Sequence, residues 1–75
     1  MDDELVLAIV ERITGYKATL THEDFSDAVV FRLKIPIGEL RLRVSRQNLE
    51  NDAPNGYQNF AKALRRRWEG VAPCR

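Results

Sequence analysis

The sequence is poor in the residues that most often carry out chemistry. It holds one histidine, His22, and one cysteine, Cys74. A single cysteine excludes an intramolecular disulfide, and one histidine with one cysteine falls far short of a four-ligand zinc site. The same two side chains cannot supply a nucleophile, a base and an orienting group. We therefore expect a protein that is not an enzyme and holds no metal ion and no cofactor.

Glycine-rich loops and long apolar segments are missing as well. The four glycines stand singly at expected turns and helix ends, which excludes the usual phosphate-binding loop. The apolar run from Leu5 to Val10 is far shorter than the roughly 20 residues that span a bilayer. The start, Met1 to Glu4, is acidic, whereas a signal peptide begins with basic residues. From these features we expect a cytoplasmic protein.

The chain is rich in charge of both signs, but the signs are unevenly distributed. Lys and Arg number 12 and Asp and Glu number 11 in 75 residues, for a formal net charge of +1. Residues 1–27 carry seven acids and two bases, whereas residues 28–75 carry four acids and ten bases. Such asymmetry is a hint of a charged partner, although the two halves could instead neutralise each other within the fold.

Hydrophobic periodicity predicts a helix, three strands and a second long helix. Apolar residues recur at helical spacing from Asp3 to Thr14 and from Tyr57 to Glu69. Period-two patterns predict a strand over Tyr16 to His22 and two strands joined by a tight turn within Ala28 to Arg46. Residues 1–75 should therefore form a single compact α+β domain of order α-β-β-β-α. Its sheet is an antiparallel meander with both helices on one face.

Two connecting segments add detail to this fold. Ser45 to Glu50 is expected to form one helical turn after the third strand. The acidic loop Glu23 to Asp27 joins the first two strands, and we expect its Phe25 to pack back against the core.

The stretch from Ala28 to Arg46 carries the main functional hypothesis. Its apolar positions alternate with positions that are nearly all basic, so one sheet face should be apolar and the other cationic. Four bases should gather on the open face: Arg32, Lys34, Arg41 and Arg43. Arg65 and Arg66, on the second long helix, form another basic cluster and complete the set of expected partner-binding residues. Pairing of the four sheet-face bases with the acids of the Glu23 to Asp27 loop would remove the main support for this hypothesis.

Arginine-rich surfaces suit protein partners, because a guanidinium group binds carboxylates in a bidentate way. The favoured function is a small non-catalytic binding protein that docks on a protein or ribonucleoprotein partner, as an inhibitor or adaptor does. Phage-encoded anti-defence proteins have this general appearance, by analogy and not by any shared motif. A homodimer is also compatible with the sequence, through Leu7, an exposed strand edge or Cys74.

Direct RNA or DNA binding through the basic sheet face is the alternative. The predicted element order resembles that of the double-stranded-RNA-binding domain. The start of the second long helix, Asn55 to Phe60, lacks the lysine-rich signature of that family, and acids on the first helix would repel phosphate. We therefore transfer no functional residue from that family to this chain.

Overall fold

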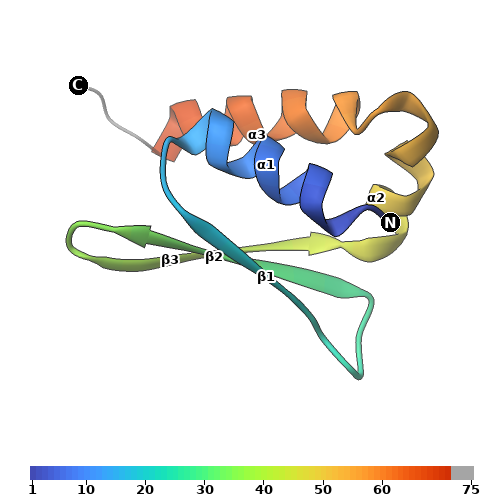
Figure 1. The fold of residues 1–75 in the computed structure, drawn as a ribbon, viewed down its shortest axis with the longest axis horizontal. Coiled ribbons are helices and arrows are strands. Elements are labelled where there is room, and N and C mark those ends of the chain that lie inside the picture. The colour runs from blue at the N-terminus through green and yellow to red at the C-terminus, as the bar shows by residue number, and fades with distance from the viewer. Residues whose placement is uncertain (72–75) are drawn as a thin grey trace.

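In the computed structural model of the chain, which describes residues 1–71, helices cover one face of a three-stranded sheet (Figure 1). The elements are α1 (Asp3–Thr14), β1 (Ala18–His22), β2 (Ala28–Ile35), β3 (Gly38–Ser45), α2 (Arg46–Asp52), a 3₁₀ turn (Ala53–Asn55) and α3 (Gln58–Val71). The α+β class and the order α-β-β-β-α are confirmed. The short helix α2 lies where the sequence predicted one helical turn.

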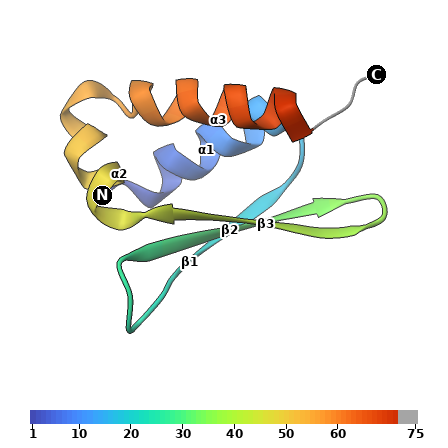
Figure 2. The same cartoon turned by 180° about the vertical axis from the view of Figure 1, so that it is seen from behind.

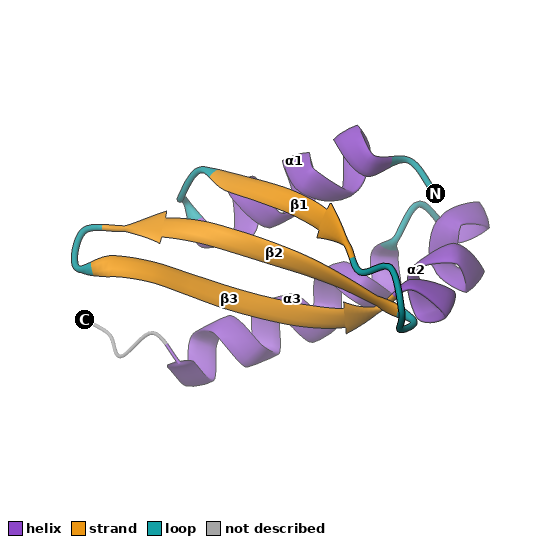
Figure 3. Ribbon diagram, turned by 90° about the horizontal axis from the view of Figure 1, so that it is seen from below, coloured by secondary structure: helices purple, strands orange, loops and turns teal. Residues whose placement is uncertain are grey.

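The sheet is an antiparallel meander with β2 in the centre. β1 pairs with β2 from Ala18 opposite Leu33 to His22 opposite Val29, and β2 pairs with β3 along its whole length without a break in register. The long helices α1 and α3 lie on the same side of the sheet in two opposite views (Figures 1 and 2). A view from the other side shows the strands uncovered (Figure 3).

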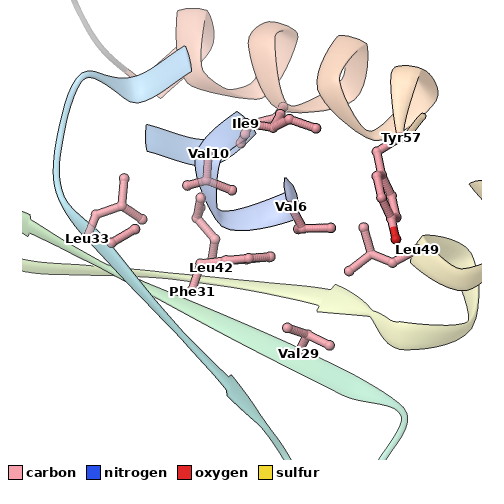
Figure 4. Packing of buried hydrophobic residues seen from close by; sticks show 11 residues of the cluster. Val6, Ile9, Val10, Val29, Phe31, Leu33, Leu42, Leu49 and Tyr57 are labelled. Atoms are coloured by element: carbon pink, nitrogen blue, oxygen red, sulfur yellow. The ribbon is translucent and has the colours of Figure 1, made fainter. Parts of the chain in front are cut away.

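One core joins the helices to the covered face of the sheet (Figure 4). Phe31 and Leu33 of β2 are fully buried, as are Val6 and Val10 of α1. The ring of Phe31 stacks on that of Phe60 with centroids 5.8 Å apart. Burial of each such side chain stabilises the fold by about 1.5–3 kcal/mol. The apolar half of the alternating pattern in β2 therefore lies in the core, as the sequence predicted.

The start of α3 is fixed by a buried aspartate. Asp52, only 7% exposed, accepts hydrogen bonds from the backbone N–H of Phe60 at 2.9 Å and from the side-chain amide of Asn59 at 3.0 Å. Tyr57 has a left-handed backbone, with φ of 60°, and its hydroxyl accepts a hydrogen bond from the backbone N–H of Asp2 at 2.8 Å. Together these contacts connect α2, α3 and the start of α1.

Some boundaries differ from those predicted. β1 begins at Ala18 and not at Tyr16, whose ring packs edge-on against Trp68 with centroids 6.1 Å apart. α3 continues through Gly70 to Val71, since Gly70 keeps a helical backbone. Leu7 is partly buried against the core. Cys74, considered above as a dimer contact, lies outside the described residues.

Replacing the buried aspartate, in Asp52→Ala, should destabilise the fold. The backbone N–H of Phe60 would lose its partner at a partly buried position, and a loss of about 1–3 kcal/mol in the free energy of unfolding is expected. Urea denaturation measures this loss. Asp24→Ala, at an exposed loop position, is the matched control and should stay within about 0.5 kcal/mol of the wild type. If Asp52→Ala unfolded at the same urea concentration and with the same slope as the wild type, Asp52 would not stabilise the start of α3.

Candidate binding surface on the open face of the sheet

The structure brings the four sheet-face bases together. Arg32 lies directly opposite Arg41, and Lys34 lies opposite Glu39. Arg43 lies opposite Val30, one step along the same face. All four basic side chains are exposed, on the side of the sheet that the helices leave free (Figure 3). We use "open face" for this surface: Thr19, Thr21, Val30, Arg32, Lys34, Glu39, Arg41 and Arg43.

At the centre of the open face, two like charges lie directly opposite each other. The backbone N–H of Arg46 donates to the carbonyl of Asp27 at 3.2 Å, which makes those two residues a hydrogen-bonded pair. Because such pairs alternate along an antiparallel ladder, Arg32 and Arg41 form a non-hydrogen-bonded pair, the kind whose side chains lie closest. Like charges directly opposite each other destabilise a sheet. The fold therefore tolerates a local electrostatic cost at this point.

Few acids relieve that cost. Arg41 contacts Glu39, two residues away on its own strand, with 3.4 Å between Nε and Oε1. Within residues 1–71, Arg32 makes no ion pair with an acid. The carbonyl of Lys17 accepts a hydrogen bond from the backbone N–H of Lys34 at 3.0 Å, which places Lys17 opposite Lys34. Its side chain therefore extends the positive charge of the face. The middle of the face thus keeps an excess of positive charge.

Arg43 is the exception, because the acidic loop engages it. Its Nη2 lies 2.9 Å from Oε1 of Glu23 and 3.3 Å from the hydroxyl of Ser26. The hydrogen bonds from Ser26 and from Arg43 lower the pKa of Glu23 below its ordinary value of 4.5. Glu23 is therefore ionised at neutral pH and partly neutralises Arg43. This pairing offsets the charge of Arg43. The excess positive charge of the open face therefore rests on Arg32, Lys34 and Arg41, which have Glu39 as the acid within the face.

The same loop presents an exposed aromatic ring, and here the expectation from the sequence is wrong. Phe25 is 101% exposed and does not pack against the core. Arg46 donates from Nη2 to the carbonyls of Glu23 at 3.0 Å and Ala28 at 3.3 Å, holding both ends of the loop. The loop projects away from the helical layer, on the side of the open face (Figure 1). The sequence does carry a signal for this exposure: Phe25 stands alone among acids and belongs to no periodic apolar pattern.

A second exposed apolar side chain lies at the other end of the sheet. Ile37, in the turn between β2 and β3, is 93% exposed. The cationic centre is thus flanked by Ile37 at one end and by Phe25 at the other. Neither residue was among those expected to bind a partner.

His22 has a structural role at the end of β1. Nε of Arg46 donates to Nδ1 of His22 at 3.1 Å, so Nδ1 is an acceptor in this arrangement. Nε2 then carries the proton and donates to Asp3 at 3.0 Å. Both ring nitrogens are therefore occupied by contacts that join β1 to α1 and α2.

Arg65 and Arg66 lie apart from the open face. They are exposed residues of α3, which covers the opposite side of the sheet (Figure 2). Arg66 is roughly 200° around the helix from Leu64, at about 100° per residue, and Leu64 is buried in the core. The six predicted partner-binding residues therefore form two separate surfaces and not one.

Comparison with known proteins finds no matching family model, no matching curated protein and no matching solved structure. In the part of the chain that the structure describes, no helix is long and apolar enough to cross a membrane. Nor do three potential metal ligands from His, Cys, Asp or Glu come together within residues 1–71. The open face itself is thus the basis for a functional proposal.

The lowered pKa of Glu23 can be tested directly. In Ser26→Ala, the pKa of Glu23 should rise toward 4.5, because its largest cause, the hydroxyl donor, is removed. NMR titration of the side-chain carboxyl carbon measures this value. A group with a lowered folded pKa stabilises the fold above its unfolded pKa, and that contribution is lost as pH falls through the lowered value. Ser26→Ala should therefore lose less stability than the wild type on acidification below 4.5; an unchanged pKa would contradict the assignment.

Relieving the like-charge pair should stabilise the protein. Arg32→Thr removes one of the two opposed guanidinium groups, and a gain of about 0.2–1 kcal/mol in the free energy of unfolding is expected at low salt. The gain should shrink in about 1 M NaCl, where the Debye length is about 3 Å. Lys34→Thr is the control: it introduces the same residue opposite Glu39 and should bring no gain. Equal effects of the two substitutions would disprove an electrostatic cost at Arg32.

Proposed function

We propose that this protein is a non-catalytic binding module that docks on an acidic surface of a protein or ribonucleoprotein partner through the open face. The observation that carries this proposal is the exposed pair of Arg32 and Arg41, opposed at the centre of the face without an acid between them. A partner carboxylate placed between the two guanidinium groups would form charge-assisted hydrogen bonds with both. Binding would thus remove a repulsion that the free protein carries.

The exposed apolar side chains at the two ends favour a protein partner. Phe25 and Ile37 flank the cationic centre, and aromatic residues with arginine are typical of the residues that contribute most to protein interfaces. Hydrogen bonds from Arg46 hold the loop that bears Phe25, so little ordering is needed on binding. A module of this kind acts by occupying a surface of a larger assembly, as an inhibitor or adaptor does.

Direct nucleic-acid binding is the alternative, supported by Arg32, Lys34 and Arg41, which also suit phosphate. Two features favour the protein partner over it. The residues of the open face include no aromatic side chain, and the exposed ring of Phe25 lies among the acids of its loop, where a nucleotide would meet negative charge. The acidic loop, with Glu23 ionised and Asp24 exposed, lies on the same side and would repel a phosphate backbone.

The double variant Arg32→Glu/Arg41→Glu should lose the partner. The bait proteins are immobilised wild type, this variant and the control Arg65→Glu/Arg66→Glu, which makes the same charge change on α3. Each is incubated with nuclease-treated lysate of the cells in which the protein is naturally made, and captured proteins are quantified by mass spectrometry. The wild type and the control should capture a common protein at least about tenfold more than the open-face variant, a difference of about 1.4 kcal/mol. Equal capture by all three would contradict the proposal.

A gel-shift titration separates the nucleic-acid alternative. RNA and DNA, single- and double-stranded, are titrated with the wild type at about 50 mM and about 200 mM salt, between which phosphate-driven affinity falls steeply. Binding that shows this fall and is lost in Arg32→Glu/Arg41→Glu would overturn the proposal of a protein partner. The proposal predicts no shift at either salt concentration.

A further inference from the structure

A groove runs along the outer edge of β3, between that strand and α3. Two adjoining hollows of about 370 and 250 Å³ share Val44, Phe60 and Ala63 in their walls. Four consecutive β3 residues, 42 to 45, line the smaller hollow, so the groove follows the edge of the strand and not only one of its faces. Figure 3 shows β3 as an outer strand with α3 behind it.

The groove exists because α3 presents a small residue toward β3. Ala63 is exposed, and Asn59 and Arg67, one turn before and after it, lie on the same stripe of the helix. Apolar side chains form the floor, among them Leu42 and Phe60. The core is thus partly open at this edge, and an aliphatic side chain from outside could reach Leu42.

The β3 edge also offers unpaired backbone groups. Since Arg46 and Asp27 form a hydrogen-bonded pair, the even-numbered residues of β3 bond to β2. The N–H and C=O of Arg41 and Arg43 therefore point outward. Within residues 1–71, no turn or side-chain hydrogen bond reaches these backbone groups.

The other edge of the sheet is treated differently. The backbone N–H of Ala18, which points outward from β1, donates to Oε2 of Glu11 at 3.0 Å. A side chain of α1 thus covers a donor on the β1 edge. The edge of β3 has no such cover among the described residues and lies beside the groove, so it is the better template for another strand.

Charge decides which strand can be added. Arg41 and Arg43 alternate with Leu42 and Val44 along β3, and Arg67 lines the groove from α3. A second copy of the chain whose β3 paired with this strand along the groove, centred on Leu42, would place Arg41 opposite Arg43 and be disfavoured. A strand with acids at alternate positions would place one carboxylate beside Arg41 and another beside Arg43, whose guanidinium group it would share with Glu23. Its aliphatic residues would lie over the apolar floor.

We propose that the groove receives an extended acidic segment of a partner protein, which adds to β3 as a fourth strand. Main-chain hydrogen bonds to the outward groups of Arg41 and Arg43 supply affinity. Alternating acidic and aliphatic side chains supply selectivity, because they match the cationic open face and the apolar groove. The added strand would share Arg41 with the open face, but filling the groove at Ala63 leaves Arg32 and Arg41 unchanged, so either proposal can fail alone.

Panning of a phage-displayed library tests the proposal. Random peptides of about ten residues, the length of a long strand, are selected on the full chain, with Ala63→Phe as the groove-filling variant. The control is Ala8→Phe, the same change at an exposed alanine of α1. We expect enriched peptides to alternate acidic and aliphatic residues. Their dissociation constants should rise by at least about tenfold in Ala63→Phe, about 1.4 kcal/mol, and stay unchanged in Ala8→Phe.

Amide hydrogen exchange distinguishes strand addition from simple side-chain docking. In the complex with an enriched peptide, exchange at the N–H of Arg41 and Arg43 should slow, because these amides gain acceptors. Circular dichroism checks the fold of Ala63→Phe, which we expect to be retained because Ala63 is exposed.

Three outcomes would each overturn the proposal. Panning could enrich no acidic and aliphatic sequences, or the peptides could bind Ala63→Phe as well as the wild type. Sedimentation could instead show a dimer that Ala63→Phe dissociates, which would assign the groove to a second copy.

Discussion

The amount of apolar surface that the two long helices can cover constrains this fold more than any single contact. Two long helices can cover one face of a three-stranded sheet, and both lie on the same side (Figure 1). The other face must then be polar, which an antiparallel sheet allows. Phe31 and Leu33 point into the core, so the residues between and beside them, Arg32 and Lys34, must point out. The placement of the bases is a direct consequence of the burial of their neighbours.

The acidic first part of the chain does not neutralise that surface uniformly. Its loop reaches Arg43 through Glu23, and Asp27 is occupied with Ser45 and the backbone N–H of Gln47. Arg32, at the centre, receives no acid from within the described residues. The fold therefore neutralises the charge asymmetry only in part: Glu23 pairs with Arg43 at one end of the face, and the middle keeps an excess of positive charge.

Hydrophobic periodicity was sufficient to predict the fold because each helix and strand has one consistent pattern of apolar and polar residues. The alternation in β2 gave both the core position of Phe31 and the outward position of Arg32. The same reasoning had no access to contacts between residues distant in sequence. The Glu23–Arg43 pair, the exposure of Phe25 and the groove beside Ala63 depend on how the loop and α3 sit against the sheet. The separation of Arg66 from the open face likewise follows from α3 covering the opposite side.

If the proposed function is right, the opposed arginines serve partner binding at a cost to stability. Measuring unfolding and partner capture on the same Arg32→Thr protein tests this claim most directly, because a purely structural residue would not move the two quantities in opposite directions. We expect a variant that is more stable than the wild type and captures less of its partner. A variant that is less stable, or that captures the partner as well as the wild type, would contradict it.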